Sequence, residues 1–361
     1  MRKILELNKK RNVISFWGWL RIKTDYLPAV TFIFVSRVNA TNMRIYNLAL
    51  YSAQVRVVLF KGTRFRGTDL IVMKLMIMCL FLYKSRISSY KALILTSLPN
   101  FAIKTPRQYL HIDDPKYSQE EYNRINDWII SGQKYGTKKG LILTSQYTSS
   151  QYKENCPNVD TIIISQGYTR VQNKIRKSTK DFICVYASPY LHYGDDKLSK
   201  HSTWGAQSLI DDILPLSLVL PKDIKFIFIA NIGKCAKAKL LTFPNVRTID
   251  YLEIAEYSEF LKQCSVGIYP RTHDHKRRIL KIFDYVGAGI PIVTYRLEDT
   301  KDVDDYNLGI SVTNPKAFID AIRSLFFDSS LYEKFAKNVR EFSEGKDWES
   351  LTRELENRIL P

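Results

Sequence analysis

Two series of short runs rich in Val and Ile alternate with stretches of helical character, and a polar, basic stretch at 172–180 separates the two series. Continuous apolar runs predict strands that are buried on both faces, as in parallel sheets whose crossover helices cover both sides. Right-handed crossovers then give one doubly wound sheet for each series. We therefore predict an α/β chain with two tandem Rossmann-like domains that face a cleft, where the carboxyl ends of such strands bind ligands.

The expected elements follow this alternation closely. In the first series the expected strands are 30–35, 55–60, 92–96, 108–112, 141–144 and 161–164, and the expected helices are 42–52, 70–83 and 119–130. In the second series the expected strands are 182–186, 225–230, 246–249, 266–269 and 291–294, and the expected helices are 204–213, 254–263, 279–286 and three final segments.

Length and composition are those of a folded, two-domain chain. The 361 residues exceed a typical single domain, and 45% hydrophobic with 25% charged residues exclude a disordered chain. The five cysteines are scattered, without a CxxC pair, which argues against a disulfide framework and a sequence-local zinc site. This cysteine usage fits a reducing compartment, so we expect a cytoplasmic protein.

The net charge of +18 is concentrated at one end of the chain. Residues 1–110 hold 19 Lys and Arg against 3 Asp and Glu, whereas the remaining 251 residues hold 35 against 33. Such a field suits an anionic membrane surface, a nucleic acid or a phosphorylated small molecule, or is simply solvated surface. Aromatic residues interleave with basic ones only within 11–27, which makes nucleic acid the weaker alternative.

The longest apolar run, 70–83, has 14 residues with Lys74 inside it. A membrane-spanning helix needs ~20 residues, so we expect a buried crossover helix here rather than a span. The basic first 110 residues then predict a protein that is soluble or peripheral on the inner face of a membrane.

Five segments of the second half follow one another in an order and with a spacing that are typical of one known protein family. They are Phe182–Ser188, Gly205–Ile210, Phe226–Gly233, Pro244–Pro270 and Lys281–Val293. Their order and spacing resemble the donor domain of GT-B glycosyltransferases, in particular the large retaining family that uses nucleotide sugars. The first half resembles that family more loosely, through its strand order and the segments Leu141–Tyr147 and Ile164–Gly167.

The resemblance implies a division of labour along the chain. Residues 1–175 would form a strongly basic, acceptor-binding domain and residues 181–340 a domain that binds the nucleotide sugar. Residues 341–361, which include the segment Phe342–Trp348, would form a closing helix that returns to the first domain.

Lys281 and Asp284 are the main candidates for the donor site. Their spacing places both on one face of a helix. In the resembled family the position of Asp284 holds a Glu that binds ribose hydroxyls, which implies that role for Asp284. The turn at Gly287 would let the following strand start close to the ligand. The alternative is a surface ion pair followed by a helix stop.

The chain departs from the family pattern eight residues before Asp284. Retaining members carry a second acid there that contacts the donor sugar, whereas this chain has Lys276. Either Asp274 substitutes or the sugar is held differently, so retention or inversion of configuration stays open. Arg271, after the strand at 266–269, is a candidate ligand of a phosphate.

Further candidates for the diphosphate and the base come from the resemblance alone. Ser188 lies in the turn after the opening strand, and Gly233 and Lys234 follow the strand at 225–230. The family Lys that would precede Gly205 is replaced by Trp204, so we carry Lys200 in its place.

A general base is expected in the first domain. His111, Asp113 and Asp114 lie at a predicted strand end, where an imidazole or a carboxylate can deprotonate an acceptor hydroxyl. We rank Asp113 first, because it alternates with Ile112, which should be buried. The alternative is a turn that the two carboxylates form with Pro115.

These features predict a glycosyltransferase that moves a sugar from a nucleotide-diphosphate sugar to a glycan, a lipid-phosphate-linked or a protein-linked acceptor. No metal is expected to be required, since a GT-B site generally uses none. The alternatives are a nucleotide-sugar epimerase or a phosphorylase on the same fold, or a basic, non-enzymatic nucleic-acid-binding protein.

Overall fold

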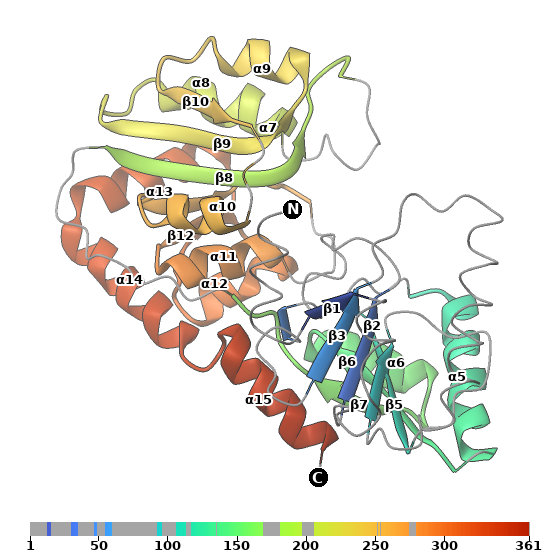
Figure 1. The fold of residues 1–361 in the computed structure, drawn as a ribbon. Coiled ribbons are helices and arrows are strands. Elements are labelled where there is room, and N and C mark those ends of the chain that lie inside the picture. The colour runs from blue at the N-terminus through green and yellow to red at the C-terminus, as the bar shows by residue number, and fades with distance from the viewer. Residues whose placement is uncertain are drawn as a thin grey trace. The chain divides into compact units, whose positions relative to one another are not determined.

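The chain forms two compact units in a computed structural model, residues 1–167 with 348–361 and residues 168–347. The structure describes residues 13–15, 30–34, 47–48, 55–59, 92–95, 106–112, 117–134, 136–168, 181–196, 206–250, 252, 254–273 and 279–360. Each unit is built on its own parallel sheet, which confirms the predicted α/β class (Figure 1).

The described part of the first unit contains a seven-stranded parallel sheet in the order β1-β3-β2-β4-β5-β6-β7. Its strands are β1 (Val13–Ser15), β2 (Val30–Phe34), β3 (Val55–Leu59), β4 (Ala92–Leu95), β5 (Arg107–His111), β6 (Lys138–Leu143) and β7 (Asp160–Ile163). The chain moves outward in opposite directions from the neighbouring strands β2 and β4, so the sheet is doubly wound about that point.

Helices α5 (Gln119–Lys134) and α6 (Gln146–Asn155) follow β5 and β6. Their inner faces and the strands share one apolar core, to which α5 contributes Ile125 and Trp128 and the strands contribute Leu110 and Leu141. The core exists because the apolar residues of α5 recur with a helical period, which puts them on one face.

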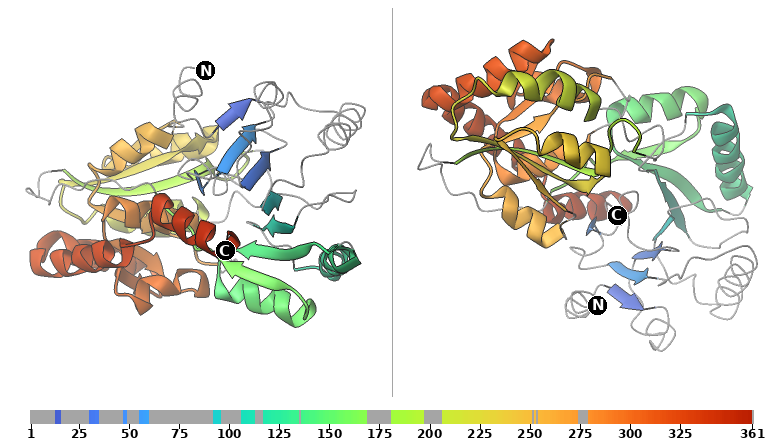
Figure 2. Two further views of the ribbon diagram at one scale, coloured as in Figure 1. Left: turned by 60° about the horizontal axis from the view of Figure 1, so that its bottom comes forward. Right: turned by 90° about the horizontal axis from the view of Figure 1, so that it is seen from above.

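The last helix, α15 (Trp348–Ile359), belongs to the first unit (Figure 2). The hydroxyl of Thr352 donates to the carbonyl of Leu48 (2.9 Å), and Arg107 donates to the carbonyl of Ile359 (2.9 Å). The final segment of the chain is thereby tied to residues more than 250 positions earlier.

The second unit contains a six-stranded parallel sheet in the order β10-β9-β8-β11-β12-β13. Its strands are β8 (Phe182–Leu191), β9 (Ile224–Ile232), β10 (Val246–Ile249), β11 (Val266–Tyr269), β12 (Ile292–Tyr295) and β13 (Gly309–Val312). Numbered from β8, this is the order 3-2-1-4-5-6 of a Rossmann sheet, in which the winding reverses between β8 and β11.

Helices cover both faces of this sheet, with α8 and α9 on one side and α10 and α11 on the other (Figure 1). The helical elements are α7 (Ala206–Ser208), η3 (Leu209–Ile213), α8 (Leu214–Ser217), α9 (Lys234–Leu240), α10 (Ile254–Leu261), α11 (Leu280–Ala288), η4 (Glu298–Thr300), α12 (Lys301–Asp305), α13 (Pro315–Phe327) and α14 (Ser329–Ser343). Because helices cover both faces, the sheet residues Phe182, Phe226 and Phe228 are completely buried in one core.

No helix among the described residues is long and apolar enough to cross a membrane. The linker predicted at 172–180, the apolar run 70–83 and nearly all of the helix expected at 42–52 lie outside the described residues.

Candidate functional site

The reversal of winding between β8 and β11 places two strand ends side by side in the second unit. The two strands pair at Val266 with Cys184 and at Gly267 with Val185. Just beyond this pairing, Tyr186 of β8 and Tyr269, the last residue of β11, therefore lie toward the edge where open α/β sheets bind ligands. Helix α11, which carries Lys281 and Asp284, follows β11 in the chain.

Tyr285 anchors α11 to this edge. Its buried hydroxyl lies 3.2 Å from the carbonyl oxygens of both Val185 and Ile268, one on β8 and one on β11. Gly267 makes the approach possible, because a Cβ on Gly267 would collide with the Tyr285 ring. Lys281 and Asp284 lie on the same helix as this anchor, four residues and one residue before it, so their position is fixed by the sheet.

Two cations gather over the tyrosine rings at this edge. The Lys281 ammonium lies 5.0 Å from the ring centroid of Tyr186 and 5.7 Å from that of Tyr269. The Arg271 guanidinium lies 6.0 Å from the centroid of Tyr269, and its Nε is buried without a hydrogen-bond partner. Neither cation forms an ion pair with a carboxylate of the described residues, although both side chains are half-buried.

The electrostatics of the cluster are those of a positive site. Burial and then the neighbouring Arg271 lower the pKa of Lys281, against the opposing effect of Tyr186. Burial alone would raise the pKa of Tyr186, but the positive field of Lys281 and Arg271 outweighs it and lowers that pKa. Two half-buried like charges close together favour the binding of an anion.

Asp284 lies on the same helix as Lys281, one turn on. Burial raises the pKa of Asp284 to about 7, even though Lys281 and the Tyr257 hydroxyl act in the opposite direction. Tyr257 comes from α10, and its hydroxyl is buried. A half-buried carboxyl at this position can accept hydrogen bonds from hydroxyl groups once it is ionised.

Ser188 lies in a bulge that lets β8 continue beyond the predicted end at Tyr186. The register of β8 with β9 shifts between Ala187 and Tyr190, and Pro189, which has no N–H to donate, lies inside the shift. Ser188 is half-buried and its hydroxyl lies next to the Tyr186 phenol, so it belongs to the same cluster.

Gly233 and Lys234 stand at the start of α9, where the sequence predicts a ligand contact. The carboxylate of Asp196 already occupies this turn and accepts from the backbone N–H groups of Cys235 and Ala236 at 2.9 Å. A Cβ on Gly233 would collide with that carboxylate. Asp196 thus caps α9, since Gly233 has no side chain to do so. The sequence did not predict this role of Asp196, because Asp196 and Gly233 lie 37 positions apart.

Gly287 lies inside α11, one residue before its end. The left-handed residue that ends the helix is Gly289, with φ of 64°. Gly287 is covered by the ring of Tyr168, whose Cδ2 would lie 2.6 Å from a Cβ on Gly287. Gly289 therefore forms the turn that ends the helix, and Gly287 makes a close packing contact.

His111 is the last residue of β5 in the first unit and is 5% exposed. Ile112 is buried in the core below α5, as predicted, so His111 lies on the opposite face of the sheet. The other candidates, Asp113, Asp114, Lys200 and Asp274, lie outside the described residues, as does Lys276.

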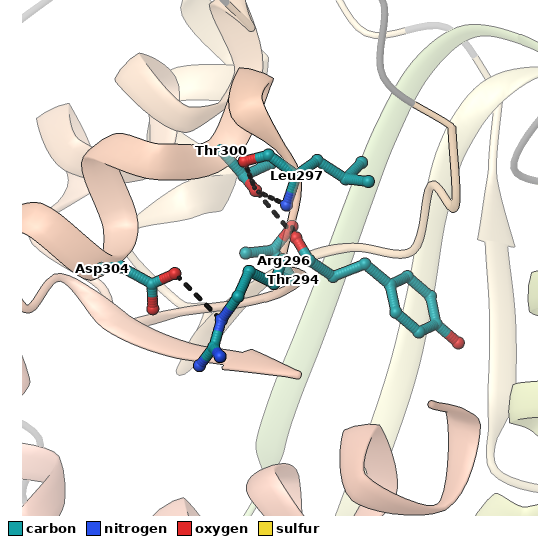
Figure 3. A network of polar contacts seen from close by, with 6 residues as sticks. Thr294, Arg296, Leu297, Thr300 and Asp304 are labelled. Carbon is teal, nitrogen blue, oxygen red and sulfur yellow. Dashed lines mark hydrogen bonds and ion pairs between the residues drawn. The ribbon is translucent and has the colours of Figure 1, made fainter. Parts of the chain in front are cut away.

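A polar network that the sequence did not predict fixes the loop after β12 (Figure 3). The hydroxyl of Thr294 lies 3.2 Å from the carbonyl oxygen of Tyr269, so it links the ends of β11 and β12. Thr300 donates to the carbonyl of Tyr295 at 2.7 Å, and Arg296 pairs with Asp304 at 3.4 Å. The loop after β12 is thereby held to the sheet.

Among the described residues, no group of three or more His, Cys, Asp or Glu side chains is arranged to hold a metal ion. At the level of sequence, no family model matches the chain, and no curated protein matches it.

Solved structures match over nearly the whole chain. HepE from Anabaena, in complex with UDP and glucose, covers 92% of this chain and 99% of its own, with 12% identity and a TM-score of 0.63. A glycosyltransferase from Rickettsia africae covers 92% and 98%, with 10% identity and a TM-score of 0.62. WaaG, a glycosyltransferase involved in lipopolysaccharide biosynthesis, covers 92% and 99%, with 12% identity and a TM-score of 0.58. The chain therefore has the GT-B fold, as the sequence predicts.

Proposed function

We propose that this chain, with its GT-B fold, is a glycosyltransferase that moves a sugar from a nucleotide-diphosphate sugar to an acceptor hydroxyl. The observation that carries the proposal is the pair of half-buried, unpaired cations, Lys281 and Arg271, at the point where the winding of the second sheet reverses. A diphosphate is the anion that such a pair suits, and the reversal point is where Rossmann sheets bind nucleotides.

The proposed division of roles follows from the side-chain chemistry. Lys281 and Arg271 neutralise the negative charge that develops on the diphosphate as it leaves the sugar. Asp284, when ionised, accepts hydrogen bonds from the ribose hydroxyls. Ser188 donates from the bulge in β8 to the same diphosphate.

The comparisons support a uridine nucleotide as the first donor to test, because the HepE and TarM structures were solved with UDP bound. We propose the first unit as the acceptor half, with the general base among His111, Asp113 and Asp114.

The basic balance of residues 1–110 supports reversible docking on an anionic membrane, since each basic residue near such a surface contributes ~1 kcal/mol. Sedimentation with anionic but not neutral vesicles, with release by salt, tests this part of the proposal. Equal binding to both kinds of vesicle would contradict it.

Calorimetric titration with UDP, GDP, ADP and TDP tests the donor site. One of the four should bind to the wild-type chain, and Lys281→Met should weaken it at least 10-fold. Lys337→Met, on an exposed lysine of α14, is the matched control and should bind normally. If none of the four nucleotides binds, or if Lys281→Met binds as tightly as the wild type, the donor site is wrong.

The reaction class is tested with the cognate nucleotide sugar. A glycosyltransferase consumes it in proportion to added acceptor, whereas an epimerase needs no acceptor and a phosphorylase needs inorganic phosphate. Turnover that does not depend on an acceptor would favour one of those two alternatives.

A further inference from the structure

Two tyrosines lie at the carboxyl-end edge of the sheet in the first unit. Strands β5 and β6 are parallel neighbours, paired from Arg107 with Lys138 to His111 with Ile142. The segments that follow them therefore leave the sheet at the same edge. Tyr117 precedes α5 and Tyr147 is the second residue of α6, so both stand where doubly wound sheets bind ligands.

The two rings form an open corner. Their centroids are 6.2 Å apart and their planes meet at 78°. Tyr147 is 47% exposed, whereas the other neighbour of Tyr117, Tyr152, is fully buried at a centroid distance of 6.2 Å. The corner thus has a firm base and one exposed ring.

Hydrogen bonds hold the corner in place. The hydroxyl oxygens of Tyr117 and Thr148 are 3.1 Å apart, and that of Thr148 is 3.0 Å from that of Ser145. Tyr152 donates to the Glu121 carboxylate at 2.7 Å. Tyr117 itself has φ of 49°, a left-handed conformation that bulky residues rarely adopt, so the surrounding contacts fix its ring against local preference.

The described segment that carries Tyr147 is uncharged. Residues 144–152 contain no charged side chain, in a chain where 54 basic and 36 acidic residues make up a quarter of the sequence. The described exposed neighbours in sequence carry amides and hydroxyls, namely Ser118, Gln119, Gln146 and Ser150, and the next exposed charge on α5, Glu120, is acidic.

This chemistry matches a neutral polyhydroxylated ring. The faces of aromatic rings carry negative charge density that attracts the C–H groups on one face of a sugar, and amides and hydroxyls bond its hydroxyls. A nucleic acid or a phosphate group would instead call for cations, and the described segments 117–122 and 144–152 carry none.

We propose that Tyr117 and Tyr147 form a saccharide subsite, in which an uncharged pyranose ring stacks on Tyr147. That the bound saccharide is the acceptor of glycosyl transfer rests on the proposed function. The subsite itself rests only on the corner and its surroundings, so the two claims fail separately.

The test is a glycan array probed with the fluorescently labelled full chain. The wild type should retain a set of neutral glycans, and Tyr147→Ala should lose at least 10-fold of that signal. Tyr147→Phe, which keeps the ring, should retain most of it, since stacking and not the hydroxyl provides the contact. Tyr306→Ala, which removes an equally exposed tyrosine of the second unit, is the matched control and should bind as the wild type does.

Calorimetric binding of the cognate nucleotide is measured on the same four proteins. Unchanged nucleotide affinity with lost glycan signal in Tyr147→Ala supports the subsite. Equal glycan signals in wild type and Tyr147→Ala, or no retained neutral glycan in the wild type, would each overturn it. If the wild type binds no nucleotide, that result counts against the proposed function and not against the subsite.

Discussion

The ring of Tyr168 lies directly on Gly287, so that a Cβ added to Gly287 would come within 2.6 Å of Tyr168 Cδ2. The hydroxyl of Tyr168 donates to the carbonyl of Ser343 at 2.5 Å, which leaves the ring little freedom to withdraw. Tyr168, the first residue of the second unit, thus packs against α11, the helix that carries Lys281 and Asp284.

Gly287→Ala should destabilise the protein by ~1–3 kcal/mol, because an extra carbon in a close-packed contact forces neighbours apart. Thermal denaturation measures the effect. In a Tyr168→Leu background the same change should cost less, since the ring is absent. An equal cost in both backgrounds would contradict the contact.

Asp284→Asn should stabilise the protein at pH 8 and have little effect near pH 4. Burial raises the pKa of Asp284 to about 7 in the folded state, whereas the unfolded chain loses the same proton near its ordinary value of 3.8. Between these values the unfolded state binds fewer protons, so the contribution of Asp284 to stability falls as pH rises. An amide cannot ionise and avoids the loss, which we expect to be ~1–3 kcal/mol after allowance for solvent screening.

Denaturant unfolding at pH 4, 6 and 8 tests this sign. Asp320→Asn, on an exposed side chain of α13, is the control and should show no such trend. A stability difference between Asp284→Asn and the wild type that stays constant across the three pH values would refute the titration.

Arg271 and Asp284 should separate two parts of a nucleotide. Arg271→Gln should weaken a nucleoside diphosphate by ~1.5–3 kcal/mol and leave the nucleoside unaffected, because only the diphosphate is charged. Asp284→Ala should weaken both, since both contain the ribose. Titrations of UDP and uridine into the two variants check this pattern, and equal losses for both ligands in Arg271→Gln would remove it from the diphosphate.

Asp196→Ala should destabilise the second unit by ~0.5–2 kcal/mol, the usual effect of losing a helix cap. Burial acts to raise the pKa of Asp196, but hydrogen bonds from the backbone N–H groups of Ala236, Cys235 and Tyr193 outweigh burial and lower that pKa. This contribution is therefore present at neutral pH and is lost as pH falls through the lowered pKa in acid. Asp195→Ala, its exposed neighbour, should be silent in the same melting experiment.

Single alanine variants of His111, Asp113 and Asp114 test the general base. Removal of the base should lower turnover ~10²–10⁴-fold with unchanged nucleotide affinity, because the base acts on the acceptor. Because His111 is almost wholly buried, His111→Ala should also lower the melting temperature, a readout that separates a structural role from a catalytic one. Wild-type turnover in all three would place the base elsewhere.

Several elements could be predicted because their signal is local. The strand Val266–Tyr269 was predicted with its observed bounds, since a short Val- and Ile-containing run between polar residues has one clear interpretation. By contrast, β8 continues past Tyr186 because a bulge accommodates Pro189, which in the sequence indicates the end of a strand. The edge strand β13 was missed, since its half-buried Gly309–Val312 carries a weak apolar signal.

The placement of two site residues relative to each other was predictable where one helix holds both. Lys281 and Asp284 share a helix, so their spacing places them on one face and the structure has them there. Tyr186, Tyr269 and Tyr285 were not identified, because in the sequence they are ordinary aromatic residues of buried elements. Their role depends on the neighbouring ends of β8 and β11, which lie about 80 residues apart in the chain.

The position of α15 has a consequence for how the protein is made. The first unit contains the beginning of the chain and also Trp348–Pro361, so the ribosome must finish the entire second unit before that helix exists. Domains usually fold as units in the order of their synthesis. Here the nascent first unit lacks the partners of the Leu48 carbonyl and of Arg107, which are Thr352 and the Ile359 carbonyl, until residues 348–361 have been made.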